Sequence, residues 1–278
     1  MTRAGHKGAA IRAILFILLT ALAVSILYPL FWMVMTSFKT NRELFLNTWA
    51  LPTTWQWSNY VLAWKAGVGR FFFNSVFVTT ISTAAATLIG ALAAYPLSRF
   101  DFRGRTAILL FIVGGLMLAP QISLISLYKL LQGLGIYNTY WAMIVPYVAY
   151  RIPFTVFLLW SYFLFLPREV EEAAYSDGCT SWGILWHVVL PMSRPIIATA
   201  ALLSARVIWN EFMFALVFVE DSALRTIPIG LMGLKSQVDT DWTVLLAGLT
   251  MSAIPIILLF ILTQKQFVRG LAEGGVKG

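Results

Sequence analysis

The chain has few of the residues that build disulfides, metal centres and hydrolytic sites. Its 278 residues include one cysteine, Cys179, and two histidines, His6 and His187. A single thiol excludes an intrachain disulfide and a cysteine-based metal site. The two histidines are far apart in the sequence, and neither has a second ligand at metal-binding spacing. The sequence therefore predicts no metal site and no catalytic residue.

A phosphate-binding loop is also missing. The pattern Gly-x-x-x-x-Gly-Lys-Ser/Thr, which holds the phosphates of ATP, occurs nowhere in the sequence. We therefore expect the chain itself to bind neither ATP nor another cofactor. It also lacks an internal repeat, whereas many secondary transporters are built from repeated halves.

Charge is scarce and apolar residues are abundant. Charged residues make up 12% of the chain, hydrophobic residues make up 59%, and the mean hydropathy is +0.80. A soluble domain could not bury so much apolar surface, so the composition indicates a membrane protein. A membrane-spanning helix needs about 20 mostly apolar residues. The stretches that qualify lie near residues 13–38, 71–97, 106–127, 140–166, 195–218 and 242–262.

These stretches predict an all-α polytopic membrane protein with six transmembrane helices. Residues 1–278 are expected to form a single transmembrane domain, since no separable soluble segment is present. The first stretch is too long for the core of a signal peptide, and no small-residue cleavage site follows it. We therefore expect it to remain as a membrane anchor.

The distribution of Lys and Arg predicts the orientation. More of these residues fall in cytoplasmic segments when both termini are placed inside, and the short loop holding Arg99, Arg103 and Arg105 is the clearest example. The net charge of +8 is then expected to favour contact with anionic lipid. No soluble basic surface remains for binding nucleic acid.

Residues 167–194 interrupt the apolar pattern and predict a helix-turn-helix. Pro167 suits the start of a helix because its missing N–H costs nothing there. Asp177 and Gly178 are expected to end that helix. Acidic residues near its beginning favour the positive end of the helix dipole; these are Glu169, Glu171 and Glu172.

A second short helix is expected to follow, with Ser181 as its N-cap and Pro191 at its end. Apolar residues recur along it at helical spacing: Trp182, Leu185, Trp186 and Val189. The expected result is a carboxylate cluster on one part of the hairpin and an aromatic face on the other. An amphipathic hairpin lying on lipid would have a similar pattern.

The same stretch resembles the EAA loop of binding-protein-dependent ABC importer permeases. That motif consists of Glu-Ala-Ala, Gly after three residues, an aliphatic residue after nine more, one further residue and then Leu-Pro. The matching residues here are Glu172, Ala173, Ala174, Gly178, Val188, Leu190 and Pro191. The resemblance implies a cytoplasmic loop that couples the permease to an ATPase, with Glu171 and Asp177 in the same contact.

Softer similarities point to the second permease subunit of maltose-type carbohydrate importers. They lie at residues 137–142, 209–212 and 267–278, and the resemblance covers nearly the whole chain. It implies half of a carbohydrate translocation pore in the plasma (inner) membrane of a bacterium or archaeon. It also implies a homologous second permease, two ATP-binding subunits that hold ATP and Mg, and an extracytoplasmic solute-binding protein.

The resemblance gives the C-terminal tail a role as well. In maltose-type subunits a similar end reaches into the interface between the two ATPase subunits, and small residues allow close backbone approach. A disordered tail is the alternative interpretation. The residues concerned are Gly274, Gly275, Val276, Lys277 and Gly278.

Ionisable groups inside the membrane are costly, so they are candidates for the solute path. Arg151 either ties two helices together through a carboxylate or carbonyl or faces the solute, and we favour the tie. Asn210 and Glu211 lie late in the fifth stretch, where Glu211 is either a polar gate or a structural hydrogen-bonding group. Arg206 lies one helical turn before Asn210 and is expected to share its face.

Two other classes of function remain open. One is an ABC importer permease for a polyamine, an amino acid or phosphate. The other is a secondary carrier or a membrane-embedded enzyme. The absence of repeated halves argues against the carrier, and the spans lack a cluster of His or carboxylate residues for acid–base or metal chemistry.

Overall fold

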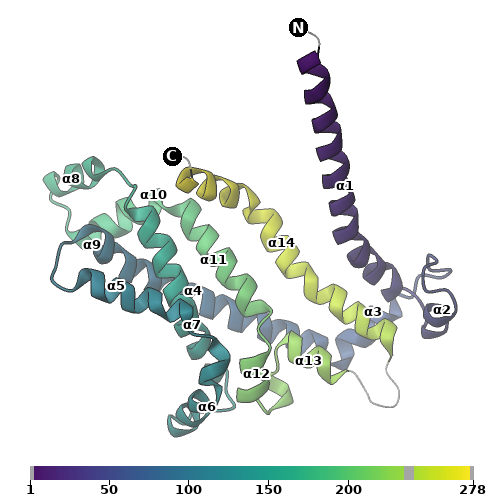
Figure 1. The fold of residues 1–278 in the computed structure, drawn as a ribbon. Coiled ribbons are helices and arrows are strands. Elements are labelled where there is room, and N and C mark those ends of the chain that lie inside the picture. The colour runs from purple at the N-terminus through teal and green to yellow at the C-terminus, as the bar shows by residue number, and fades with distance from the viewer. Residues whose placement is uncertain (1–2, 235–240, 276–278) are drawn as a thin grey trace. The chain divides into compact units, whose positions relative to one another are not determined.

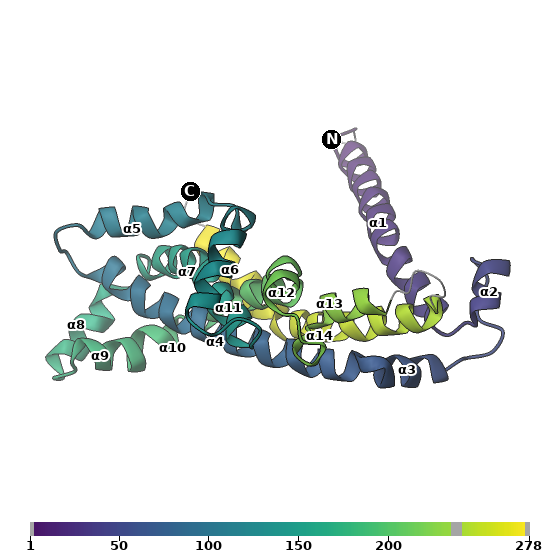
Figure 2. The same ribbon diagram turned by 90° about the horizontal axis from the view of Figure 1, so that it is seen from below.

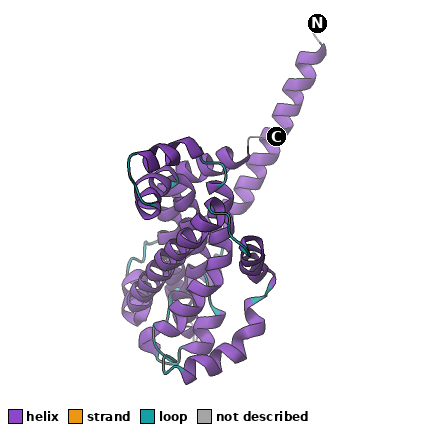
Figure 3. Ribbon diagram, turned by 90° about the vertical axis from the view of Figure 1, so that its left-hand side faces the viewer, coloured by secondary structure: helices purple, strands orange, loops and turns teal. Residues whose placement is uncertain are grey.

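The computed structural model describes residues 3–234 and 241–275. Over these residues the ordered elements are helices and no strand is present, which confirms the all-α prediction (Figure 3). The chain divides into two units. One consists of residues up to Val68 together with Gly233–Ser252, and the other of Gly69–Met232 together with the residues from Ala253 onward. We describe each unit by itself.

Four helical stretches of the described chain are long and apolar enough to cross a membrane: Ile11–Ser37, Ser58–Arg99, Trp141–Phe163 and Trp242–Leu262. Two further pairs of helices pass the same test together, although each pair is sharply bent: Arg105–Met117 with Pro120–Gly133, and Ser181–Met192, which belongs to the polar loop, with Arg194–Trp209. The total is six if each bent pair is one span. The protein is therefore a multi-pass membrane protein.

The expected span at 106–127 is not a straight helix. Helix α5 (Arg105–Gly114) continues as η2 (Gly115–Met117), and η3 (Pro120–Ser123) leads into α6 (Leu124–Gly133) at a bend of 92°. The residues at the bend, Leu118 and Ala119, are extended. Pro120 explains the break because proline disfavours helical geometry in the preceding residue and cannot donate an N–H.

The expected span at 195–218 is also interrupted. Helix α11 (Arg194–Trp209) ends before Asn210, and α12 (Met213–Phe218) is a separate short helix. The residue before α12, Phe212, has a non-helical φ of −121°. Apolar periodicity could not reveal this break, because the residues on both sides of it are apolar.

The first unit contains α1 (Arg3–Ser37), α2 (Asn41–Leu46), α3 (Ser58–Ala63), η1 (Trp64–Val68) and the first part of α14 (Trp242–Gly275). The buried Lys39 links the end of α1 to the residues that follow α2, because its Nζ donates to the carbonyls of Asn47 and Thr48 at 3.0 Å each. The apolar window of α1 has no buried residue within the described chain. Lipid or another subunit must therefore cover it.

The second unit is built on two long helices, α4 (Gly69–Arg99) and α7 (Trp141–Phe163), which pack side by side (Figures 1 and 2). Small residues recur every fourth position on the buried face of α4: Ser82, Ala86, Gly90 and Ala94. A Cβ added at Gly90 would lie 2.5 Å from Cγ2 of Thr155 on α7. The glycine therefore permits the close helix packing that small residues allow in membranes.

Two apolar clusters complete this unit. One joins α7, α12 and α6 through buried side chains such as Met143, Phe214 and Leu131. The other joins the ends of α4 and α7 to the polar loop through Leu159, Ile184 and Val189. The second cluster holds the loop against the transmembrane helices.

Candidate functional site: the polar loop and a cavity between the helices

The first part of the polar loop is a regular helix. Helix α8 (Arg168–Ser176) begins directly after Pro167, with Glu169 and Glu171 in its first turn. It ends at Asp177, and Gly178 then adopts a φ of +85°. Glycine tolerates this left-handed conformation without steric cost, which is why the chain can reverse here.

The second part differs from the expectation in its cap. Thr180, and not Ser181, is the N-cap of α9 (Ser181–Ile184), because its Oγ1 accepts a hydrogen bond from the N–H of Gly183 at 3.3 Å. The hydroxyl of Ser181 instead forms a 2.9 Å hydrogen bond with Tyr175 on α8. The neighbouring hydroxyl residue thus takes the capping role, and Ser181 joins the two helices.

The four residues expected on the aromatic face divide by burial. Helix α9 continues through η4 (Leu185–Val189), whose ends Leu185 and Val189 are buried, whereas Trp182 and Trp186 are exposed. The π-helical turn over these residues shifts the side-chain register away from α-helical spacing. The helical run ends with α10 (Leu190–Met192), one residue after Pro191.

Glu171 lies inside the protein. Its Oε1 is 2.6 Å from Nη2 of Arg99, and the two side chains are only 9% and 5% exposed. The same nitrogen of Arg99 donates to the carbonyl of Leu166 at 3.1 Å. This buried ion pair fastens α8 to the C-terminal end of α4. Glu171 is therefore occupied within the chain rather than presented on the surface.

The remaining motif residues form the outer surface of the loop. Glu172, Ala173, Asp177 and Gly178 are exposed, as is the free thiol of Cys179. Further residues of the motif are partly buried: Ala174, Val188, Leu190 and Pro191. A carboxylate, small residues and a reversed turn are therefore available for contact with another protein.

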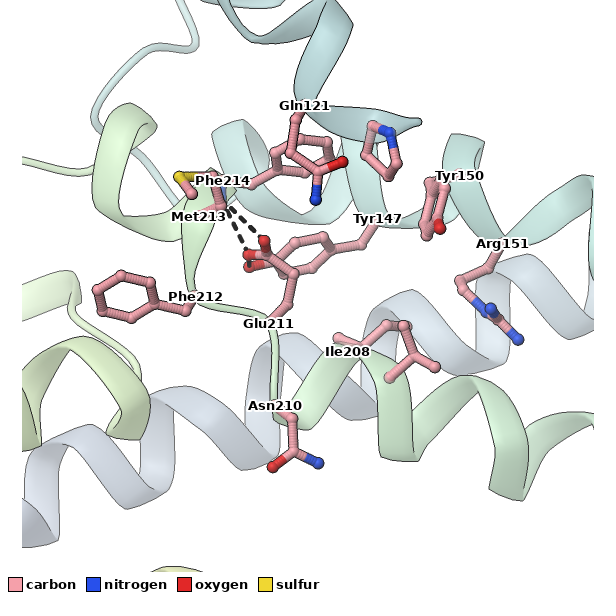
Figure 4. A pocket seen from close by; sticks show the side chains of 12 residues that line it. Gln121, Tyr147, Tyr150, Arg151, Ile208, Asn210, Glu211, Phe212, Met213 and Phe214 are labelled. Atoms are coloured by element: carbon pink, nitrogen blue, oxygen red, sulfur yellow. Dashed lines mark hydrogen bonds between the residues drawn. The ribbon is translucent and has the colours of Figure 1, made fainter. Parts of the chain in front are cut away.

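A cavity of about 380 Å³ lies among α7, α11, α12 and η3 (Figure 4). All three residues of the expected solute path line it. The full lining is Pro120, Gln121, Tyr147, Tyr150, Arg151, Val207, Ile208, Asn210, Glu211, Phe212, Met213 and Phe214. The interruption after α11 contributes to the wall of this cavity, because residues 210–214 at the break are all among those that line it.

Glu211 stabilises the start of α12. Its carboxylate accepts hydrogen bonds from the N–H groups of Phe214, at 2.9 and 3.1 Å, and Ala215, at 3.3 Å. Its Oε2 also accepts a hydrogen bond from the hydroxyl oxygen of Tyr147, at 2.6 Å. A carboxylate at the first N–H groups of a helix satisfies donors that have no partner within the helix. This contact is the physical reason for the new helix.

Arg151 ties α7 to α11, although among the described residues its hydrogen-bond partner is neither a carboxylate nor a carbonyl. Its Nε donates to the Oγ of Ser204 at 3.3 Å, and its guanidinium carbon lies 4.5 Å from the ring centroid of Phe154. The residue is only 8% exposed. The tie favoured by the sequence is thus present, but a neutral hydroxyl supplies it.

Asn210 and Arg206 contact each other one helical turn apart. The side-chain amide of Asn210 donates to the carbonyl of Arg206 at 2.8 Å, and both residues are exposed. The contact uses the backbone carbonyl of Arg206 and not its guanidinium. Arg206 is not among the residues that line the cavity.

Three polar residues that line this cavity were not among the expected solute-path residues: Gln121, Tyr147 and Tyr150. Tyr147 precedes Arg151 by four positions, so helical spacing alone places both on one face of α7. Gln121 could also have been recognised from the sequence, because an amide within an apolar stretch needs a polar environment. Both line the cavity with Arg151 (Figure 4).

The segment at residues 137–142 ties the start of α7 to two other parts of the unit. Asn138, at a φ of +54°, accepts hydrogen bonds from the N–H groups of Glu220 and Asp221 at 2.9 Å each. Tyr140 donates to the side-chain oxygen of Asn74 at 2.8 Å. Burial, together with its hydrogen bond to Glu220, raises the pKa of Tyr137 above its ordinary value.

The C-terminal tail lies partly outside the described residues. Gly274 and Gly275 belong to the last turn of α14. Val276, Lys277 and Gly278 fall beyond the part of the chain that the structure describes. The expected insertion between ATPase subunits therefore stays a prediction.

Residues 86–272 match the family described as binding-protein-dependent transport system inner membrane component. The probable ABC transporter permease protein YurM of Bacillus subtilis (strain 168) is 55% identical over 255 residues, covering 92% of this chain and 85% of YurM. The trehalose/maltose transport system permease protein MalG of Thermococcus litoralis is 36% identical over 274 residues, covering 96% and 97%. The diacetylchitobiose uptake system permease protein NgcG of Streptomyces coelicolor is 34% identical over 265 residues, covering 94% and 88%.

The fold is similar to that of a chain in the crystal structure of a bacterial ABC transporter involved in the import of the acidic polysaccharide alginate. The TM-score is 0.81 at 23% identity, and the match covers 96% of this chain and 99% of the other. The membrane-spanning helices, the polar loop and the family match all indicate the same class of protein. The chain belongs to the family of binding-protein-dependent transport system inner membrane components, and it is a transport subunit rather than an enzyme.

Proposed function

We propose that this chain is the permease subunit of an ATP-driven, binding-protein-dependent importer for a carbohydrate. With a homologous second permease it forms the translocation pore. The observation that supports the carbohydrate assignment most strongly is similarity over nearly the whole chain to the trehalose/maltose permease MalG and the diacetylchitobiose permease NgcG. These relatives favour a sugar over a polyamine, an amino acid or phosphate as the solute.

Two ATP-binding subunits and an extracytoplasmic solute-binding protein complete the proposed complex. ATP and Mg are held by the ATP-binding subunits, since this chain lacks the loop that cradles phosphates. A binding protein is suggested by a second solved neighbour, a bacterial alginate transporter in complex with an alginate pentasaccharide-bound periplasmic protein, which has a TM-score of 0.64 at 13% identity.

In this proposal the polar loop transmits movement of the ATPase to the membrane helices. The exposed Glu172 contacts the ATPase, and the buried pair of Glu171 and Arg99 passes displacement of α8 to α4. The coupling works between two states, one open to each side of the membrane. The C-terminal residues Gly274–Gly278 enter the ATPase interface in one of these states.

Reconstitution tests the function directly. Proteoliposomes that hold the complete complex, with binding protein and a carbohydrate outside and ATP inside, should accumulate the carbohydrate. Proteoliposomes that hold this chain alone should accumulate none, because hydrolysis belongs to the partner. Uptake by the chain alone, driven by an ion gradient, would contradict the proposal and support a secondary carrier.

The lone thiol tests the proposed orientation, in which both termini and the polar loop are cytoplasmic. Cys179 is exposed beside Gly178, so a membrane-impermeant maleimide should label it in inside-out vesicles and not in intact spheroplasts. Mass spectrometry of the chain provides the readout. A Cys179→Ser variant is the control for background, and labelling from the outside would reverse the topology.

A further inference from the structure

The cavity contains two residues that carry charge at neutral pH, Arg151 and Glu211. The other residues that line it are apolar or neutral polar. The character of the cavity therefore depends on how each of these two charges is stabilised within the chain.

The charge of Glu211 is stabilised where it lies. Its carboxylate accepts hydrogen bonds from two N–H groups at the start of α12 and from the hydroxyl of Tyr147. These donors supply both hydrogen bonds and the positive end of local backbone dipoles. Figure 4 shows the carboxylate turned toward Tyr147 and Phe214. Glu211 therefore has little demand for a further partner.

The charge of Arg151 has no such partner among the described residues. A guanidinium has five N–H donors, and the hydrogen bond found here goes from Nε to the neutral hydroxyl of Ser204. Within the described chain no carboxylate lies within 4.0 Å of it. The contact with the ring of Phe154 stabilises a cation only modestly. Arg151 is only 8% exposed, and a buried positive charge inside a membrane protein is costly unless an anion pairs with it.

The surroundings of Arg151 suit a ligand that combines hydroxyl groups with an anionic group. Gln121 and Tyr150 line the same cavity, and an amide and a hydroxyl can bond to sugar hydroxyls without favouring charge. The volume of about 380 Å³ lies within the range of small-molecule sites. The free nitrogens of the guanidinium can bind a carboxylate in a bidentate manner.

We infer that this cavity accepts an acidic carbohydrate, with Arg151 as the specificity-determining residue that pairs with its anionic group. The inference rests on the proposed function and adds the chemical class of the solute. Glu211 maintains the shape of the cavity by holding α12. Arg151 provides the uncompensated positive charge.

The charge of the cavity can be measured without knowing the solute. In the assembled complex carrying Cys179→Ser, the further substitution Gln121→Cys reports on the cavity through its reaction with methanethiosulfonate reagents. We expect an anionic ethylsulfonate reagent to react faster than a cationic trimethylammonium reagent, by about tenfold relative to their rates with free thiol. Arg151→Gln should abolish that preference, and Arg151→Lys should keep it.

Arg206→Gln is the matched control, because it removes an arginine of α11 that does not line the cavity. It should leave the preference unchanged. An equal reactivity of the two reagents before any substitution would overturn the inference, since it would mean that a carboxylate of the second permease already neutralises Arg151.

Transport provides an independent test, in which the probes are a digalacturonate and the corresponding neutral galactose disaccharide. We expect ATP-dependent uptake of the acidic probe and a loss of about tenfold or more in Arg151→Gln. Uptake of the neutral disaccharide at a rate that Arg151→Gln leaves unchanged would overturn the inference. That result would still support the proposed carbohydrate importer, so the two proposals can fail separately.

Discussion

Replacing Arg99 with alanine is expected to destabilise the protein by about 3–5 kcal/mol. The substitution leaves the carboxylate of Glu171 buried without its partner, and removing one member of a buried pair has a cost of this size. It also frees α8 from the end of α4. Thermal unfolding of the purified protein, followed by size-exclusion chromatography after heating, measures the effect.

A nearby ion pair supplies the control. Asp101 is 90% exposed and pairs with Arg105 at 2.7 Å, so Asp101→Ala should change stability by about 1 kcal/mol or less. The double variant Arg99→Ala/Glu171→Leu removes both charges and should recover much of the loss, because an apolar side chain can replace a buried pair. Equal stability of Arg99→Ala and Asp101→Ala would show that the buried pair has no special weight.

Replacing Glu172 with lysine is expected to abolish most ATP-driven uptake while leaving the permease folded. The side chain is exposed in the chain itself, so the change breaks no contact within the fold. In the proposed complex it replaces an attraction to the ATPase with repulsion, and the loss of one charged partner in a buried contact is worth about 3–5 kcal/mol. Uptake and solute-stimulated ATP hydrolysis by the reconstituted complex are the measurements.

The control for this variant is Asp101→Lys, which makes the same change in charge at an exposed side chain outside the loop. It should assemble and transport like the unaltered protein. If Glu172→Lys also retained full solute-stimulated hydrolysis and uptake, the proposed contact between this loop and the ATPase would have to be abandoned.

Much of this protein could be predicted from local features of its sequence. Hydropathy indicates the membrane helices, because a span of about 20 apolar residues is a local property. The helical stretch after Pro167 and the turn at Gly178 follow from the backbone preferences of proline and glycine. The motif from Glu172 to Pro191 indicated the permease family before any three-dimensional information.

Breaks inside apolar stretches were harder to predict from the sequence. Pro120 was a visible signal for the bend between η2 and η3, but proline also occurs within intact helices such as α4 and α7. The break before α12 depends on Glu211 binding the N–H groups of Phe214 and Ala215. Sequence periodicity does not show which N–H groups will donate hydrogen bonds to a carboxylate.

Only the tertiary structure distinguished residues of the same type from one another. Glu171 and Glu172 are neighbours in the sequence, yet one is buried against Arg99 and the other is exposed. Arg151 and Glu211 are both ionisable groups within apolar stretches, yet only Glu211 has its charge satisfied within the described chain. The physical reason is that partners for a charge come from different helices, so helix packing decides which charges remain available.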